Sequence, residues 1–118
     1  MNNSDLTIVE YLIKHGADVN VSDKYENSIF LLACKNNNLE FIKYLIEHDA
    51  NINGTDRLGN NGLLISCQNN NLEITKFLVD IGVKINVPNK KGYTPLIKAC
   101  EMNNIDMVQF LLNHGAEV

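Results

Sequence analysis

A period of 33 residues runs through this 118-residue chain and constrains its fold more than any other feature. The segment CKNNNLE at 34–40 returns as CQNNNLE at 67–73, and Cys34, Cys67 and Cys100 are 33 residues apart. Self-similarity at such a period indicates a repeat architecture, in which each unit buries its apolar face against its neighbours. We therefore expect one elongated domain of stacked units.

The whole chain divides at this period. Because the first unit holds only the second half of the pattern and the last stops early, both end units are incomplete. The chain is therefore expected to be a piece of a longer array, or to self-associate through its uncapped ends. The expected units are a partial copy at 1–22 and repeats at 23–55, 56–88 and 89–118, the last lacking its final hairpin.

The sequence of each repeat predicts two helices. Ser28, Asn61 and Thr94 occupy an expected N-cap position, and Pro95 follows at the first helical position, where its missing N–H costs nothing. The first helix should then cover the apolar segments IFLLACK, GLLISCQ and PLIKACE. In the second, apolar residues recur at helical spacing. In the first full repeat these are Leu39, Ile42, Leu45 and Ile46.

The asparagine runs are interpreted as turn chemistry. Asn37, Asn70 and Asn103 are expected to take a positive φ between the two helices, because asparagine tolerates that conformation better than other non-glycine residues. Gly82 and Gly115 should end their second helices in the same left-handed region. The asparagines that come next are expected to be N-caps of the second helices; they are Asn38, Asn71 and Asn104.

This pattern resembles the ankyrin repeat, whose 33-residue units carry a T-P-L-H signature, two antiparallel helices and a projecting β-hairpin. GYTPLIKAC at 92–100 and HGADVN at 15–20 are similar to the motifs of that family, and the resemblance covers essentially the whole chain. It implies an all-α fold, an ankyrin-repeat α-solenoid of helix-turn-helix units with hairpin or finger loops. It also implies a non-catalytic scaffold for protein–protein interaction.

Some positions depart from the family pattern. The signature histidine is replaced by Leu31, Leu64 and Ile97, Asp49 replaces a glycine, and Gly62 stands in place of proline. We expect the second full repeat to be the least stable, and Gly62→Pro to raise the melting temperature by restricting the unfolded chain.

The composition and charge of the chain argue against several other classes of protein. No segment approaches the roughly 18 apolar residues of a membrane helix, and the first five residues have no signal-peptide pattern. A net charge of −4 gives no general attraction to nucleic acid. Three cysteines without a C-x-x-C pair favour a reducing compartment, so an intracellular location, cytoplasmic or nuclear, is expected.

No constellation for catalysis, a cofactor or a metal is expected. The three cysteines occupy the same place in successive repeats, too far apart for a disulfide or a shared zinc. No nucleophile elbow, phosphate-binding loop or zinc-protease motif is present. The histidines are expected to lie near outer-helix ends, where they can interact with the helix dipole. They are His15, His48 and His114.

Ankyrin repeats usually bind partners on their concave side, so the resemblance implies a surface made of hairpin tips and inner helices. The matching tip positions are Lys24, Tyr25, Asn27, Arg57, Leu58, Asn60, Lys90, Lys91 and Tyr93. The matching positions on the inner helices are Lys35, Asn36, Gln68, Asn69, Glu101 and Met102.

Charge is expected to be polarised across the domain. Lys24, Arg57 and Lys90 share one repeat position and should form a basic row along the tips. Acidic residues on the outer helices include Glu10, Glu47 and Asp80. Because the tips are expected to be basic and to carry tyrosines, the protein partner is expected to be an acidic and apolar segment, not nucleic acid or membrane. Three alternatives stay open: a spacer within a longer array, without a partner of its own, an enzyme or ligand-binding domain with a deep polar pocket, and nucleic-acid binding, which would rest only on the basic tips.

Overall fold

The computed structural model describes residues 3–118, with side chains from Thr7 onward. Met1 and Asn2, which open the partial copy, lie outside the described residues. The described residues form seven α-helices in an elongated body of 44 × 25 × 22 Å. The helices are α1 (Asn3–Lys14), α2 (Ile29–Lys35), α3 (Leu39–Glu47), α4 (Gly62–Gln68), α5 (Leu72–Asp80), α6 (Pro95–Glu101) and α7 (Ile105–Asn113).

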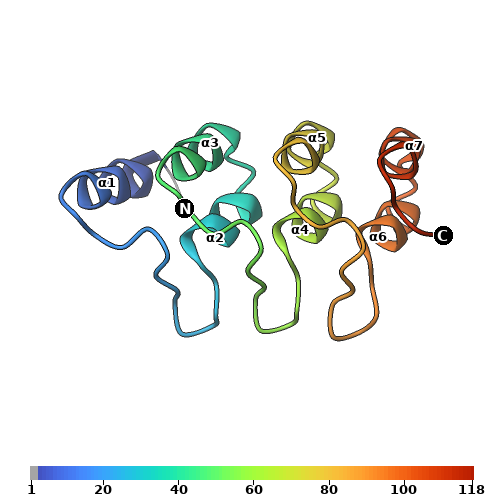
Figure 1. Cartoon of the computed structure of the whole chain (residues 1–118), viewed down its shortest axis with the longest axis horizontal. Coiled ribbons are helices and arrows are strands. Elements are labelled where there is room, and N and C mark those ends of the chain that lie inside the picture. Colours follow the sequence, from blue (N-terminus) through green and yellow to red (C-terminus); the bar gives the residue numbers. More distant parts are fainter. Residues whose placement is uncertain (1–2) are drawn as a thin grey trace.

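Two parallel rows of helices make up the solenoid (Figure 1). The short helices α2, α4 and α6 form the inner row, and α1, α3, α5 and α7 form the outer row. Three finger loops project from the inner row, on the side away from the outer helices. The predicted α-solenoid is confirmed, with α1 as a half unit at the N-terminal end.

The predicted helix caps are confirmed at both helices of each full repeat. The side chains of Ser28, Asn61 and Thr94 each accept a hydrogen bond from the backbone N–H three residues later. The asparagines before the outer helices do the same; they are Asn38, Asn71 and Asn104. These bonds satisfy amides that a helix start leaves without an intrahelical partner, and so they fix where each helix begins.

Left-handed residues set the turns between helices. Asn37, Asn70 and Asn103 have φ of 57°, 58° and 54°. Gly82 and Gly115, at φ of 95° and 101°, follow the outer helices as predicted. In each case the sequence places asparagine or glycine where the backbone requires positive φ.

The expected β-hairpins are not formed as strands. Within residues 3–118 the one β-bridge pairs Ser22 with Ser28, at the base of the first finger. Each finger is instead closed by two backbone hydrogen bonds, such as Asp56 N to Asn60 O at 3.1 Å and Gly59 N to Asp56 O at 2.9 Å. The side chain of the first residue satisfies two further amides in each finger, so these amides do not need a strand ladder.

The core lies between the two helix rows and continues from repeat to repeat. Leu31 and Leu64, which replace the signature histidine, are buried there. Ser66 and Thr75 place two hydroxyls in this core, 2.9 Å apart. Each is also bonded to a backbone carbonyl, so both polar groups are satisfied. No helix in the described part of the chain is long and apolar enough to cross a membrane.

The packing around position 62 argues against the expectation that proline there would stabilise the second repeat. A Cβ atom at Gly62 would lie 2.9 Å from Cε2 of Phe30, whose side chain is buried. Substitution would therefore overpack the junction between α2 and α4.

Candidate interaction surface

Each finger is organised by the side chain of its first residue. Oδ1 of Asp56 accepts hydrogen bonds from the backbone N–H groups of Leu58, at 3.0 Å, and Asn60, at 2.9 Å. Asp23 and Asn89 accept the equivalent pairs of bonds in the other two fingers. The alignment of these three residues was visible in the sequence, but this role was not inferred from it. The signal was an Asp or Asn followed three residues later by glycine in the second and third fingers, a pattern typical of such turns.

Hydrogen bonds join each finger to the next, so the three form one surface. The Arg57 guanidinium donates to the carbonyl oxygen of Lys24 at 2.7 Å. Between the second and third fingers, Lys90 N donates to Leu58 O at 2.9 Å, and the Asn89 amide donates to Asn60 Oδ1 at the same distance. Asn60 is buried, at 8% exposure, and its polar atoms hold the fingers in place.

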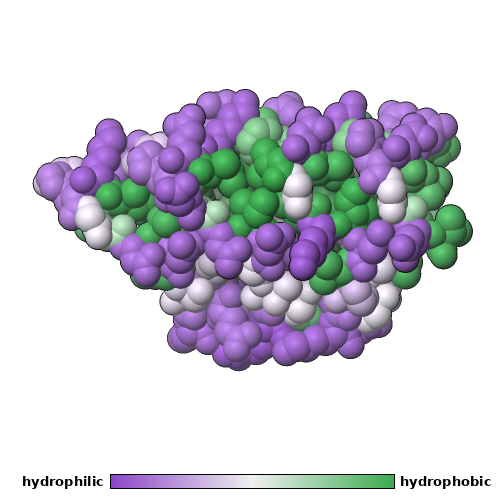
Figure 2. Space-filling view, viewed as in Figure 1, coloured by the Kyte–Doolittle hydropathy of each residue, from purple (hydrophilic) through white to green (hydrophobic). Residues whose placement is uncertain are grey.

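The residues of the expected basic row differ in their contacts: some are engaged within the fold, and others are exposed without an ion pair. Arg57 is engaged by the Lys24 carbonyl and lies 5.6 Å from the centre of the Tyr25 ring. The ammonium of Lys24 lies 5.1 Å from the same ring. Within the part of the chain whose side chains are described, no ion pair engages the exposed Lys90 and Lys91. Hydrophilic residues dominate the finger tips in Figure 2.

Two adjoining cavities form a groove between the fingers and the inner helices, which we call the concave groove. They have volumes of about 230 and 240 Å³ and share Leu58, Asn60 and Gln68. The first is further lined by Lys35, Asp56, Ile65 and Asn69, and the second by Asn89, Lys91, Tyr93 and Lys98. The structure therefore brings seven predicted site residues together: Lys35, Leu58, Asn60, Gln68, Asn69, Lys91 and Tyr93.

At the N-terminal end of the concave groove, an ion pair joins two repeats. Lys35 Nζ lies 3.2 Å from Asp56 Oδ2 and donates to Asn27 Oδ1 at 2.6 Å. Burial alone would raise the pKa of Asp56, but the hydrogen bond from the Asn60 N–H and the contact with Lys35 hold that pKa below its ordinary value. The carboxylate is therefore ionised and neutralised within the fold.

At the other end of the concave groove, Lys98 is the main residue that sequence reasoning missed. Its ammonium lies 4.3 Å from the centre of the Tyr93 ring and 3.0 Å from Glu101 Oε2. Lys98 is on α6, one helical turn before Glu101, a spacing that places both side chains on one face. The sequence offered that i, i+3 pair as a signal.

The remaining predicted residues lie outside these two cavities. Lys24, Tyr25, Arg57 and Lys90 are exposed at the finger tips. The other four are Asn27, Asn36, Glu101 and Met102, of which Asn27 is half-buried and the rest are exposed. Asn69, although it lines the concave groove, donates to the carbonyls of Cys34 and Lys35 and so ties α4 to α2.

The cysteines and histidines are spread along the solenoid. Cys34 and Cys67 are fully buried, and burial raises the pKa of each thiol to about 12. Cys100 is exposed. The ring nitrogens of His48 and His114 lie close to carbonyl oxygens of their own helices. Among the described residues, no three metal-ligating side chains converge.

The family model described as Ankyrin repeats (3 copies) matches residues 1–89 and 50–118, and so spans the whole chain. This chain belongs to the ankyrin repeat family. Ankyrin repeats are generally protein–protein interaction modules without catalytic activity. No curated protein matches the chain.

The last ankyrin unit leaves its stacking face uncovered. Ile97 is 43% exposed, whereas Leu64, its counterpart one repeat earlier, is fully buried. Cys100 is likewise exposed and Cys67 buried. Two cavities open on this face, with volumes of about 450 and 280 Å³. This uncovered face differs from the concave groove in chemistry, because most of the residues that line its two cavities are apolar.

Proposed function

We propose that this ankyrin domain binds a segment of a partner protein in the concave groove. The observation that carries the proposal is the joining of two cavities along three fingers whose positions are fixed by hydrogen bonds between them. A preformed groove loses little conformational entropy when a partner binds.

The side chains in and beside the concave groove favour a segment with acidic and apolar groups. Leu58 is 54% exposed and offers an apolar contact, and Tyr93 lies against Lys98 in the same groove. The acidic groups of the groove region, Asp56 and Glu101, are already paired with lysines. Lys90 and Lys91 are exposed cations at the third finger that no ion pair engages among the described side chains, and so they are available to a carboxylate of the partner.

The proposal can be tested by reversing those two charges. In a crosslinking capture from lysate of the source organism, K90E/K91E would be compared with wild type and with the control K14E/K84E. The control has the same net charge but changes lysines that line neither cavity. Arg57 is left unchanged, because its guanidinium holds the first two fingers together.

A partner captured by wild type and by the control, but lost in K90E/K91E, would support the proposal. Its affinity for the purified domain should fall by about tenfold or more on charge reversal and should weaken with added salt. Equal capture by all three proteins would exclude the concave groove as the binding site. Capture of no partner by any of them would favour the spacer alternative.

A further inference from the structure

At two of the three junctions between neighbouring outer helices, a lysine of one helix lies over an aromatic ring of the next helix. Lys43 on α3 places its ammonium 5.7 Å from the centre of the Phe77 ring on α5. One repeat later, Lys76 on α5 lies 5.8 Å from the centre of the Phe110 ring on α7. A cation over an aromatic ring is attracted by the negative face of the ring. At each of these two junctions, therefore, the earlier helix provides the cation that lies over the aromatic ring of the next helix.

The first junction has the aromatic ring but not the cation. Tyr44 is the counterpart of Phe77 and Phe110, and the residue in the place of Lys43 and Lys76 is Glu10. Here α1 contributes a carboxylate instead of an ammonium. The Tyr44 hydroxyl donates to the backbone carbonyl of Glu10 at 3.4 Å, which links α3 to α1 without using the carboxylate.

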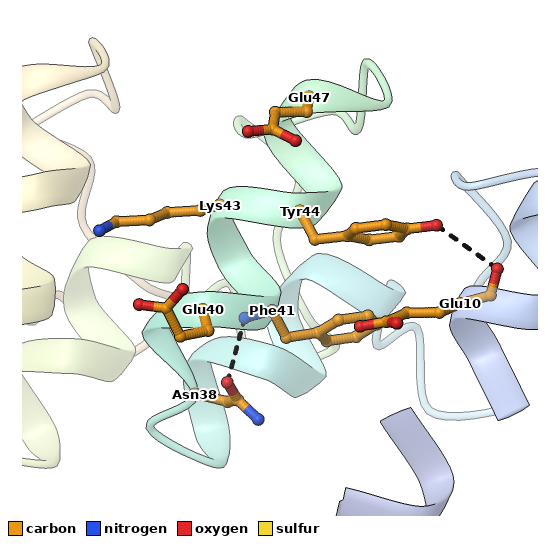
Figure 3. A pocket seen from close by; sticks show the side chains of 7 residues that line it. All are labelled: Glu10, Asn38, Glu40, Phe41, Lys43, Tyr44 and Glu47. Atoms are coloured by element: carbon orange, nitrogen blue, oxygen red, sulfur yellow. Dashed lines mark hydrogen bonds between the residues drawn. The ribbon is translucent and has the colours of Figure 1, made fainter. Parts of the chain in front are cut away.

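A cavity of about 350 Å³ lies at this first junction. The rings of Phe41 and Tyr44 are stacked at its wall, with centroids 6.0 Å apart, and both extend from α3 toward α1 and Glu10 (Figure 3). Phe41 is specific to this repeat, because Ile74 and Met107 are its counterparts. The other two junctions thus have a lysine over the ring, whereas this one has a second phenyl ring and a glutamate.

A histidine also stacks on the Tyr44 ring. The centroids of Tyr44 and His48 are 4.2 Å apart, and those of Phe110 and His114 are 4.1 Å apart. Because Lys76 lies over the Phe110 ring despite that histidine, the same contact leaves Tyr44 accessible to a cation.

The charge around the cavity is negative. Glu10 faces it from α1, and Glu47 lines it one helical turn beyond Tyr44, with a side chain that extends away from α1 in Figure 3. Glu40 and Lys43 also line it, their side chains likewise extend away from α1 in Figure 3, and Lys43 is engaged with Phe77. Within the described part of the chain, no ion pair neutralises Glu10 or Glu47.

We propose that this cavity binds an arginine side chain of a partner protein. The guanidinium lies over the Tyr44 ring, in the place that lysine takes at the other two junctions, and donates hydrogen bonds to the Glu10 carboxylate. Arginine fits better than lysine, because its planar group can stack on an aromatic ring and bind a carboxylate with two donors. This site is on the outer side of the solenoid and does not depend on the concave groove.

The test is an NMR titration of the ¹⁵N-labelled domain with N-acetyl-arginine amide. A parallel titration uses N-acetyl-citrulline amide, which has nearly the same shape and no charge. The arginine probe should give saturable shifts at the amides of Glu10, Tyr44 and Glu47, and the citrulline probe should bind about tenfold more weakly or not at all. Equal binding of both probes, or arginine-induced shifts confined to other residues, would overturn the proposal.

Variants at position 10 provide an internal control. E10K restores the lysine of the other junctions, so its own ammonium should cover Tyr44 and weaken binding of the arginine probe by about tenfold or more. E10Q, which removes the charge without filling the cavity, should weaken binding less. E73K makes the same charge change on α5, outside the cavity, and should leave binding unchanged. An E10K domain that binds the probe as wild type does would also contradict the proposal.

Discussion

The ring of Phe30 occupies the space in which a side chain at position 62 would begin. A Cβ atom on Gly62 would lie 2.9 Å from Phe30 Cε2 and 3.1 Å from Cys34 Sγ. One repeat later the counterparts are Leu63 and Pro95, a smaller side chain opposite a larger one. The two junctions of the inner row therefore reach dense packing with opposite distributions of volume.

Gly62→Pro should lower the stability of the domain. The backbone before it is already suitable for proline, since Asn61 is extended at ψ of 176°. Sterics decide the outcome, because the buried Phe30 ring must move, and overpacking of this kind costs about 1–3 kcal/mol. Urea unfolding followed by circular dichroism would measure the change.

The double variant F30L/G62P separates packing from backbone effects. It copies the Leu63 and Pro95 pair, so we expect it to be clearly more stable than G62P alone, and the two effects to be non-additive. Purely additive effects would show that Phe30 does not determine the preference at position 62.

Glu26→Gly should stabilise the first finger. Glu26 has φ of 65°, and the counterpart positions in the other fingers are glycines, Gly59 and Gly92. Left-handed backbone costs a residue with a Cβ about 1–2 kcal/mol, and the greater freedom of glycine in the unfolded chain offsets part of this gain. We expect a net increase in unfolding free energy of about 0.5–1 kcal/mol.

The reciprocal change, Gly92→Glu, is the matched control. Gly92 has φ of 84°, and a Cβ atom there would meet nothing within 4 Å, so backbone strain alone is introduced. G92E should destabilise the domain by about 1 kcal/mol. If both variants had the same stability as wild type, the positive φ at these tips would carry no energetic cost.

Much of the fold could be predicted, because local chemistry and the repeat period agree. Asparagine, serine or threonine at helix starts and asparagine at the turn between the two helices act within a few residues, and the structure confirms them at each full repeat. The left-handed position after the outer helix is glycine in three units and Asp49, at φ of 64°, in the first full repeat. The close approach of Phe30 to position 62 could not be predicted in the same way. It depends on a ring 32 residues earlier, and family resemblance alone suggested that proline would fit there.

The candidate surface was predictable in position but not in detail. Matching repeat positions located Leu58, Lys91 and Tyr93, which line the concave groove. That Arg57 is engaged by a neighbouring carbonyl could not be inferred, because it depends on the spacing between fingers. The aromatic cavity beside Glu10 was also missed, although Lys43, Lys76 and their counterpart Glu10 were visible at one repeat position.

Asp56→Asn should make the domain less sensitive to acid. The folded-state pKa of Asp56 lies below its ordinary value of 3.8, so the ionised carboxylate stabilises the fold above that pH, and this contribution is lost as the pH falls through the folded-state pKa. Asn89 shows that an asparagine can close a finger, so D56N should keep the turn. Urea unfolding between about pH 5 and pH 2 should show a smaller loss of stability in D56N than in wild type.

The control for this prediction is Asp80→Asn on the outer helix α5, which removes one exposed carboxylate without a bond to a finger. It should follow the pH dependence of wild type more closely than D56N does. An acid dependence that is identical in D56N and wild type would show that the Lys35 contact and the Asn60 hydrogen bond add no stability through ionisation of Asp56.

One thiol of the native domain should react rapidly with a disulfide reagent, and two should be protected. Cys100 is exposed, whereas Cys34 and Cys67 are buried with pKa values raised to about 12, so few thiolates form and reagent reaches them only when the repeats open. At pH 8 we expect the two buried thiols to react about 100-fold or more slowly than Cys100. C100S should abolish the fast phase and leave the slow one. A fast phase that persists in C100S would mean that a buried thiol opens locally, without unfolding of the whole solenoid.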